Sequence, residues 1–129
     1  MSAKDIREDA SRYFLPIFLG SNSDSHKLAA KVFRKYGITS FVLDQKHSAW
    51  DFFDPCCKFV RLSASTSPLL ICEQLIDIAK QNPYTLPMII PCSDEYRALV
   101  DKHKELLEPI FILLDEDTLF SSSPLNVIF

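Results

Sequence analysis

The sequence predicts an α/β protein built on a mainly parallel sheet of about five strands. Short apolar runs alternate along the chain with segments whose apolar residues recur at every third or fourth position, a pattern typical of strands followed by helices. The connections between successive apolar runs are too long for hairpins, so neighbouring strands should run parallel. Right-handed crossovers then place helices on both faces of the sheet, which predicts a three-layer, Rossmann-like fold.

The strands are predicted where apolar runs end at glycine, proline or polar residues. The first run contains Pro16 near its beginning, where a proline is tolerated, and Gly20 bounds its end. Its uninterrupted apolar character is typical of a strand buried on both faces. The predicted strands span residues 14–19, 38–44, 58–63, 86–92 and 109–114.

The helices are predicted from the helical recurrence of apolar residues and from signals at their ends. Ser23 or Asp24 is expected to cap the first helix, and Gly37 to end it. Pro68 suits the first turn of the second helix. The acidic residues of a third helix lie in its first turn, where the helix dipole favours them. The predicted helices span residues 23–36, 68–81 and 93–107, with shorter helical turns at 49–53 and 115–120.

The chain of 129 residues has the length of one ordinary domain. Its composition is 47% hydrophobic with only two glycines, which predicts a compact domain rather than a disordered chain or a flexible linker array. We expect an N-terminal extension over residues 1–13, one α/β domain over residues 14–120, and a linker over residues 121–129, where a Ser-Ser-Ser-Pro stretch occurs.

The charge and the apolar segments argue against several classes of partner. The formal net charge is −3 and the pI is near 5.5, so no basic surface is expected for nucleic acid or for anionic membranes. No apolar run reaches the roughly 20 residues that a membrane span requires, and the N-terminal segment has no hydrophobic signal core. We therefore expect a cytoplasmic protein. Its four cysteines, two of them adjacent, are expected to remain reduced thiols.

Two turns of the predicted fold occupy the position at which open parallel sheets bind ligands. At the carboxyl ends of parallel strands, backbone N–H groups and helix N-termini converge. The turn over residues 20–25 holds a single glycine, so it lacks the glycine-rich patterns of dinucleotide and Walker-type phosphate sites. Each turn therefore either caps its helix only, or adds a ligand contact to the cap. The candidate substrate-binding residues are Gly20, Ser21, Asn22, Ser23, Ser93, Asp94 and Glu95.

Three other features bear on chemistry. Asp44 ends the second strand, where a ribose-binding acid would lie, although an acid there also commonly begins a turn. Cys92 precedes a helix N-terminus, an environment that can activate a thiol, with His103 or His47 as conceivable partners; a buried structural cysteine is the alternative reading. The histidines and cysteines show no metal-ligand spacing, so we predict no metal site and no catalytic residue.

Short motifs in a consistent order and spacing point to a known family. The segment Pro-Cys-Ser-Asp-Glu at residues 91–95 is the most telling of them. The others are the strand into Gly20-Ser21, Tyr36-Gly37-Ile38, Val42-Leu43-Asp44, His47-Ser48, Cys57-Lys58-Phe59-Val60, Leu75-Ile76-Asp77-Ile78-Ala79 and Leu107-Glu108-Pro109. Through them, residues 15–115 resemble the N-terminal, pre-ATP-grasp domain of the carboxylate-amine ligase group within the ATP-grasp superfamily, which includes relatives of the carbamoyl phosphate synthase large subunit.

The resemblance implies the substrate-side domain of an ATP-dependent ligase, in which an amine attacks an acyl phosphate to give an amide or peptide-like bond. It implies that ATP and Mg²⁺ bind in domains following Phe129 in a longer enzyme, so this chain has no cofactor of its own and no activity alone. The implied partners are the ATP-grasp domain of the same polypeptide and a small carboxylate or amino-acid substrate.

Two other functions fit the same order of elements. One is a stand-alone binding or regulatory module of flavodoxin-like shape, and the other is a small enzyme that uses Cys92. If the chain is the substrate-side domain, the surface that docks its partner domain is expected to be apolar, and self-association of the isolated chain through that surface is a further expectation.

Overall fold

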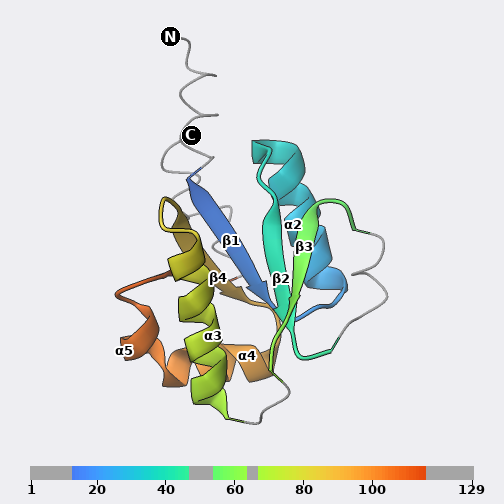
Figure 1. Ribbon diagram of the computed structural model, residues 1–129. Coiled ribbons are helices and arrows are strands. Elements are labelled where there is room, and N and C mark those ends of the chain that lie inside the picture. The colour runs from blue at the N-terminus through green and yellow to red at the C-terminus, as the bar shows by residue number, and fades with distance from the viewer. Residues whose placement is uncertain (1–12, 47–53, 64–66, 116–129) are drawn as a thin grey trace.

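The computed structural model describes residues 13–46, 54–63 and 67–115, which form five strands and four helices (Figure 1). The strands are β1 (Phe14–Leu19), β2 (Ser40–Asp44), β3 (Cys57–Arg61), β4 (Leu86–Pro91) and β5 (Ile112–Leu113). The helices are α2 (Ser23–Tyr36), α3 (Pro68–Gln81), α4 (Asp94–Lys102) and α5 (Lys104–Leu107). The predicted extension over residues 1–13, the helical turns at 49–53 and 115–120, and the linker at 121–129 lie wholly or mostly outside the described residues.

The five strands form one sheet in the order β3-β2-β1-β4-β5, and every neighbouring pair is parallel. β1 lies in the middle, where Ile17 pairs with Phe41 of β2 on one side and with Ile89 of β4 on the other. The predicted fold class, a Rossmann-like three-layer α/β fold, is confirmed. A flavodoxin-like sheet instead places its first strand between the second and the third, so the strand order is not flavodoxin-like.

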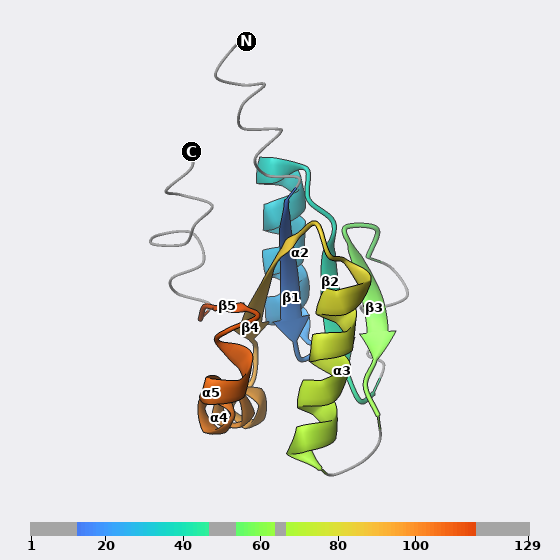
Figure 2. The same ribbon diagram turned by 60° about the vertical axis from the view of Figure 1, so that its left-hand side comes forward.

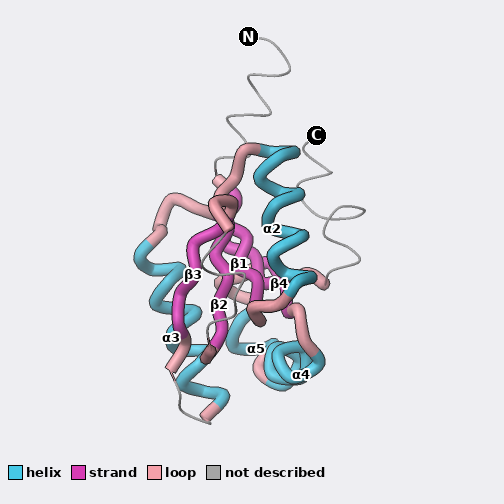
Figure 3. Tube along the Cα trace, turned by 90° about the vertical axis from the view of Figure 1, so that its right-hand side faces the viewer, coloured by secondary structure: helices cyan, strands magenta, loops and turns pink. Residues whose placement is uncertain are grey.

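Helices cover both faces of the sheet, and β1 supplies side chains to both layers by simple alternation. Figure 3 shows the strands between α2 and α3, and Figure 2 shows α4 and α5 beside α3. Phe18 packs with Ala29 and Val32 of α2, whereas Ile17 packs with Leu75 of α3 on the opposite face. Phe18 and Ile17 are fully buried, and the burial of such a side chain stabilises a fold by about 1.5–3 kcal/mol.

The ends of α2 are fixed by its flanking residues. Gly37 adopts the left-handed conformation at φ 72°, and its N–H donates to the carbonyl oxygen of Phe33, as its predicted role as helix terminator requires. At the other end the N-cap is Asn22, in an extended conformation, and neither Ser23 nor Asp24 is the cap. The prediction was one residue late because Asn22 is as good a cap as serine or aspartate, and the sequence alone does not rank them.

The C-terminal part of the chain departs most from the predicted boundaries. The helix expected over residues 93–107 is divided at His103, whose backbone (φ −109°, ψ 23°) leaves the helical region, into α4 and α5. The strand expected over residues 109–114 is reduced to Ile112–Leu113. The N–H groups of Ile110 and Phe111 donate to the carbonyl oxygen of Leu107, so the first residues of the apolar run complete the helix end instead of joining the sheet.

Two further properties bear on the class of protein. In the described part of the chain, the helices are too short or too polar to span a bilayer. All four cysteines, Cys56, Cys57, Cys72 and Cys92, are described and are free thiols, as predicted.

Candidate functional site

The carboxyl ends of β1 and β4 lie side by side, and a helix begins after each of them. Leu19 pairs with Pro91 at the last position of the two strands, and α2 and α4 follow within a few residues. The chain leaves β1 toward β2, while β4 lies on the other side of β1, which makes this edge the topological switch point where open α/β sheets bind ligands. This edge holds all seven candidate residues, namely Gly20, Ser21, Asn22, Ser23, Ser93, Asp94 and Glu95.

The backbone amides of the first turn are already bonded within the protein. The N–H of Gly20 donates to a carbonyl oxygen of β2 at 2.8 Å, and the N–H of Ser21 donates to the Asp44 carboxylate at 2.8 Å. The N–H of Asn22 donates to the hydroxyl of Ser25 at 3.1 Å. A phosphate cradle needs successive N–H groups directed at the ligand, so this turn does not fit a nucleotide phosphate.

Two candidate side chains cap the helices. The Asn22 side-chain oxygen accepts the N–H of Ser25 at 2.9 Å, while its amide donates to the backbone carbonyl oxygen of Cys92 at 2.9 Å. The Ser93 hydroxyl accepts the N–H of Tyr96 at 3.2 Å. Each cap is worth about 1 kcal/mol. Asn22 and Ser93 therefore stabilise the edge of the sheet, and Asn22 also joins its two turns.

Asp44 holds three segments together at the same edge. Its carboxylate accepts the N–H of Ser21, the N–H of Gln45 at 2.7 Å and the hydroxyl of Tyr96 at 2.9 Å. Burial, together with this hydrogen bond and the negative charge of Asp44, raises the pKa of Tyr96 well above its ordinary value. The three donors account for the carboxylate in structural terms, so a ribose-binding role for Asp44 gains no support.

A charged pocket of about 470 Å³ adjoins this edge, beyond the carboxyl ends of β4 and β5 and beside α4. The Arg97 guanidinium pairs with Asp94 at 2.7 Å, and the Lys104 ammonium pairs with Glu108 at 3.5 Å. Because these pairs are partly or fully exposed, each contributes little to stability. Their charged groups can therefore exchange partners for a ligand at small cost. The charged residues that line the pocket are Arg97, Asp101, Lys104, Glu108 and Asp115.

Cys92 is buried and does not meet its predicted partner. Its side chain packs in the apolar cluster on the α2 face of the sheet, and its thiol donates to the carbonyl oxygen of Ile90 at 3.5 Å. His103 lies at the end of α4, which packs on the opposite face, and His47 is outside the described residues. The structure therefore favours the alternative reading of Cys92 as a structural cysteine.

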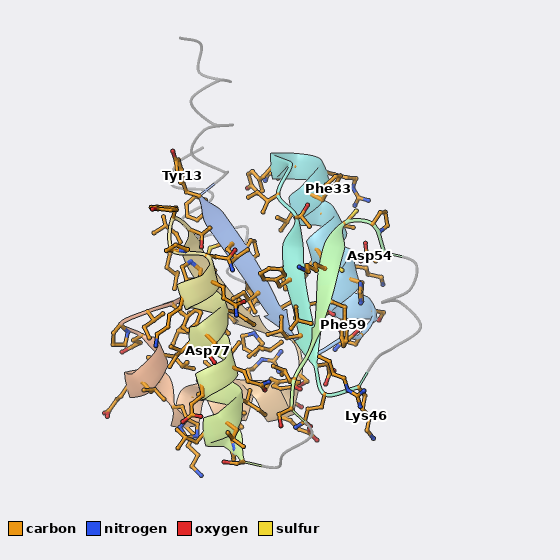
Figure 4. The ribbon with its side chains drawn as sticks, viewed as in Figure 1. Tyr13, Phe33, Lys46, Asp54, Phe59 and Asp77 are labelled. Atoms are coloured by element: carbon orange, nitrogen blue, oxygen red, sulfur yellow. The ribbon has the colours of Figure 1, made fainter. Side chains whose placement is uncertain are left out.

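A second group of polar residues lies between α2 and the segment that leads into β3, where Figure 4 shows Asp54 beside α2. The Nδ1–H of His26 donates to the Asp54 carboxylate at 2.5 Å, and the Nε2 atom of His26 lies 3.1 Å from the hydroxyl oxygen of Ser21. The Cys57 sulfur lies 3.6 Å from the same Nδ1 atom and 3.4 Å from the same carboxylate oxygen. The His26 side chain is 4% exposed and that of Asp54 is 11% exposed.

The environment of this cluster shifts the pKa values of its member Asp54 and of the neighbouring Cys56. Burial raises the pKa of Asp54, but the hydrogen bonds from His26, from the Cys56 N–H and from Cys57 outweigh it, so the pKa of Asp54 lies below its ordinary value. Burial and the nearby Asp54 charge raise the pKa of Cys56. The residues therefore provide an ionised carboxylate held against an imidazole. A pocket of about 350 Å³ opens beside them, lined by Ser23, His26, Lys27, Ala30, Asp54, Pro55 and Cys56.

The cluster offers two kinds of chemistry. Asp54, His26 and Ser21 occur in the order of a carboxylate–imidazole–hydroxyl relay, which activates a serine in acyl-transfer enzymes. Ser21 is not among the described residues that line the adjoining pocket, so this pocket does not place a substrate at the hydroxyl end of the relay. His26, Asp54 and Cys57 also form a set of nitrogen, oxygen and sulfur donors within 4.8 Å of one another.

The fold and this edge define the protein as a parallel, Rossmann-like α/β domain with its turns tied together at the switch point. Comparison with models of protein families, with curated proteins and with solved structures found no match to this chain.

Sequence reasoning found the edge but missed both pockets. His26 and Asp54 are 28 residues apart, and His26 and Cys57 are 31 residues apart, so no short motif connects them. Arg97 and Lys104 appear in sequence as ordinary charges of an exposed helix face. In the sequence, Arg97, Asp101 and Lys104 recur at helical spacing, which indicates one charged helix face. That this face lines a pocket becomes visible only when the position of β5 is known.

Proposed function

We infer that this chain is the substrate-side domain of an ATP-dependent carboxylate-amine ligase and that it holds a small carboxylate or amino acid at the carboxyl ends of β1, β4 and β5. One observation carries the proposal: two helices begin at the switch point, and a pocket of mixed charge adjoins it. The resemblance of the sequence to pre-ATP-grasp domains supplies the reaction class.

The charges of the edge suit a ligand that has both signs. The N-termini of α2 and α4 and the Arg97 guanidinium favour a carboxylate. Glu95 is exposed in the first turn of α4, and Asp101 lines the pocket, so either can meet an ammonium group. Ser23 lines the separate pocket beside His26 and not the charged pocket. Of the seven predicted residues, Glu95 is thus the best placed for the ammonium group of a ligand.

ATP and Mg²⁺ are assigned to a partner domain and not to the described residues. The turn after β1 uses its three successive N–H groups internally, so it fits no nucleotide phosphate. In the proposed enzyme, the ATP-grasp domain of the same polypeptide supplies the phosphoryl group and the cationic clamp. The role of this chain in the proposed enzyme is to bind and orient the acceptor substrate.

The proposal is tested by titrating the isotope-labelled 129-residue chain with a panel of amino acids and dicarboxylates while its backbone amide NMR signals are recorded. We expect at least one ligand to shift the amides at residues 23–24 and 94–97. Arg97→Gln should weaken that binding at least about tenfold, which corresponds to the loss of a charge-assisted contact. Lys80→Gln, a change to an exposed cation on α3, is the matched control and should leave it unchanged.

Two results would contradict the proposal. One is that no member of the panel perturbs this edge at millimolar concentration. The other is that ATP with Mg²⁺ binds the turn at residues 20–25 and releases phosphate in the presence of this chain alone, because both functions are assigned to another domain.

A further inference from the structure

The cluster between α2 and β3 has a feature that the proposed function does not use. Three side chains of different donor type converge there from three places in the fold: His26 from the second turn of α2, Asp54 from the segment before β3, and Cys57 from the first residue of β3. Their donor atoms lie within 4.8 Å of one another, and the cluster is partly or fully buried.

The spacing of the donors is close to that of a tetrahedral metal site. With zinc bonds of about 2.3 Å to sulfur and 2.0–2.2 Å to nitrogen or oxygen, the edges of a tetrahedron are about 3.3–3.6 Å long. The Cys57 sulfur lies 3.6 Å from Nδ1 of His26 and 3.4 Å from Oδ2 of Asp54. Two of the three edges therefore already have the length that zinc requires.

The third edge is shorter, because a hydrogen bond joins Nδ1 of His26 to Oδ2 of Asp54. These atoms lie 2.5 Å apart, as in a short charge-assisted hydrogen bond. A metal ion would replace the proton on Nδ1, and the two donors would separate by about 1 Å, within the reach of small side-chain rotations. Zinc binds a thiolate and a neutral imidazole, so the Cys57 thiol, which donates to Asp54, would lose its proton to solvent, while the His26 ring would keep one proton, on Nε2.

Hydrogen bonds around the cluster orient two of the ligands. The Ser21 hydroxyl lies 3.1 Å from Nε2 of His26, so it can accept the ring N–H when Nδ1 binds a metal. The backbone N–H of Cys56 donates to Oδ1 of Asp54 at 2.8 Å, which leaves Oδ2 toward the cluster. Outer hydrogen bonds of this kind fix the tautomer of a ligating histidine and the orientation of a ligating carboxylate.

We propose that His26, Asp54 and Cys57 form a zinc-binding site with a fourth coordination position open to the adjoining pocket. The pocket of about 350 Å³ is lined by His26 and Asp54 themselves, so a water or a small ligand can reach the ion there. Three protein ligands with an open position are typical of zinc sites that act on a bound ligand, whereas purely structural sites are closed by four. The mixed nitrogen, oxygen and sulfur donors suit zinc better than Mg²⁺ or Ca²⁺, which prefer oxygen.

The site is tested by titrating the reduced, metal-free 129-residue chain with Co²⁺, which replaces zinc and reports its ligands in its absorption spectrum. We expect one Co²⁺ per chain, a sulfur-to-cobalt charge-transfer band, strong visible bands of tetrahedral coordination, and displacement of Co²⁺ by Zn²⁺. Cys57→Ser should abolish the charge-transfer band and weaken binding about 100-fold or more, exceeding the 10–100-fold cost of losing an outer-shell group.

Cys72→Ala is the control, because Cys72 lies on α3, on the opposite face of the sheet, and outside the donor set. It should keep the band and bind Co²⁺ within about threefold of the unchanged protein, well under the cost of losing a ligand. A charge-transfer band that persists in Cys57→Ser, or that disappears in Cys72→Ala instead, would overturn the proposal. So would binding of several weakly held ions with octahedral spectra.

X-ray absorption of the zinc complex of the unchanged protein keeps the proposal testable if a variant fails to fold. We expect one sulfur neighbour at about 2.3 Å and nitrogen or oxygen neighbours at about 2.0–2.1 Å. A shell without sulfur would refute the site. The result is independent of the ligase proposal, because the amino-acid titration probes the edge of β1 and β4 through Arg97, whereas cobalt absorption probes Cys57.

Discussion

The side-chain amide of Asn22 donates a hydrogen bond of 2.9 Å to the backbone carbonyl oxygen of Cys92, while the side-chain oxygen of Asn22 accepts the N–H of Ser25 at 2.9 Å. One side chain thus caps α2 and joins the turn after β1 to the end of β4. Asn22 thus fixes the mutual position of the two turns of the switch point together with Asp44, which accepts hydrogen bonds from Ser21 and from Tyr96.

Replacing Asn22 separates the two roles. Asn22→Ala removes both and should lower the free energy of unfolding by about 2 kcal/mol, roughly half from the cap and half from the lost hydrogen bond to Cys92. Asn22→Asp keeps an acceptor for the cap but has no donor for Cys92. Its free energy of unfolding should therefore lie between those of Asn22→Ala and of the unchanged protein. Urea unfolding of the three proteins measures these free energies. The control is Ser23→Ala, expected within about 0.5 kcal/mol; a larger loss in that variant than in Asn22→Ala would show that Ser23 is the cap.

A side chain at position 37 should destabilise the fold through backbone strain and not through a steric clash. At φ 72°, a side chain strains the backbone, but a Cβ atom added there meets nothing within 4 Å. Gly37→Ala should therefore destabilise the fold by about 1–2 kcal/mol, and Gly37→Asn by less, because asparagine tolerates this region. Thermal unfolding compares both with Thr39→Ala, an exposed control on the same connection. Equal stability of Gly37→Ala and the unchanged protein would contradict the left-handed cap.

The hydrogen bond between Tyr96 and Asp44 predicts a dependence of stability on alkaline pH. Burial and Asp44 raise the pKa of Tyr96 above its value of 10.0 in the unfolded chain, so the folded state holds the phenolic proton more tightly. Its contribution to stability is fully present below pH 10.0 and is lost as the pH rises from there through the folded pKa, at about 1.4 kcal/mol per pH unit.

Tyr96→Phe tests this dependence in two ways. It should cost about 1.5–3 kcal/mol at pH 7, since it removes a hydrogen bond to a charged acceptor. It should also remove the additional loss of stability above pH 10.0, which unfolding curves over a series of pH values measure. Tyr84→Phe, a change to an exposed tyrosine, should alter neither quantity. Parallel alkaline curves for Tyr96→Phe and the unchanged protein would show that Tyr96 is not the group responsible.

The proposed zinc site predicts a change in stability that a chelator reverses. A ligand that binds only the folded state at a free concentration of 100 times its Kd stabilises it by about 2.7 kcal/mol. Zinc should therefore raise the Tm of the unchanged protein, and EDTA should return it to its initial value. The Tm of Cys57→Ser should not respond to zinc. A zinc response of equal size in the two proteins would place the metal elsewhere.

Most strands and helices of the fold were predictable, because their positions depend on local sequence patterns. The apolar runs identified β1 and β4 within a residue, and Gly37 and Pro68 marked ends of α2 and α3 correctly. The C-terminal boundaries were not predictable in the same way. The apolar run at residues 109–114 has one character throughout, and only the hydrogen bonds of Ile110 and Phe111 to Leu107 show that part of it ends a helix.

The site was predictable as a region and not as a set of interactions. The positions of Gly20 and Ser93 after strands placed both turns at one edge, because parallel strands align their carboxyl ends. The hydrogen bond between Asp44 and Tyr96 could not be read from the chain, since no spacing rule connects two residues that are 52 positions apart. The same holds for His26 and Asp54, which meet only because α2 packs over β2 and β3.

The central position of β1 has a consequence for how the chain is made. β1 leaves the ribosome before one of its two flanking strands, β4, which is synthesised only after α3. Ile17 therefore cannot pair with Ile89 until β4 has been made. Long-range parallel pairing of this kind is slow and leaves apolar segments open to aggregation. Until β4 has been synthesised, the apolar segment Phe14–Leu19 therefore lacks one of the two strands that flank it in the folded sheet.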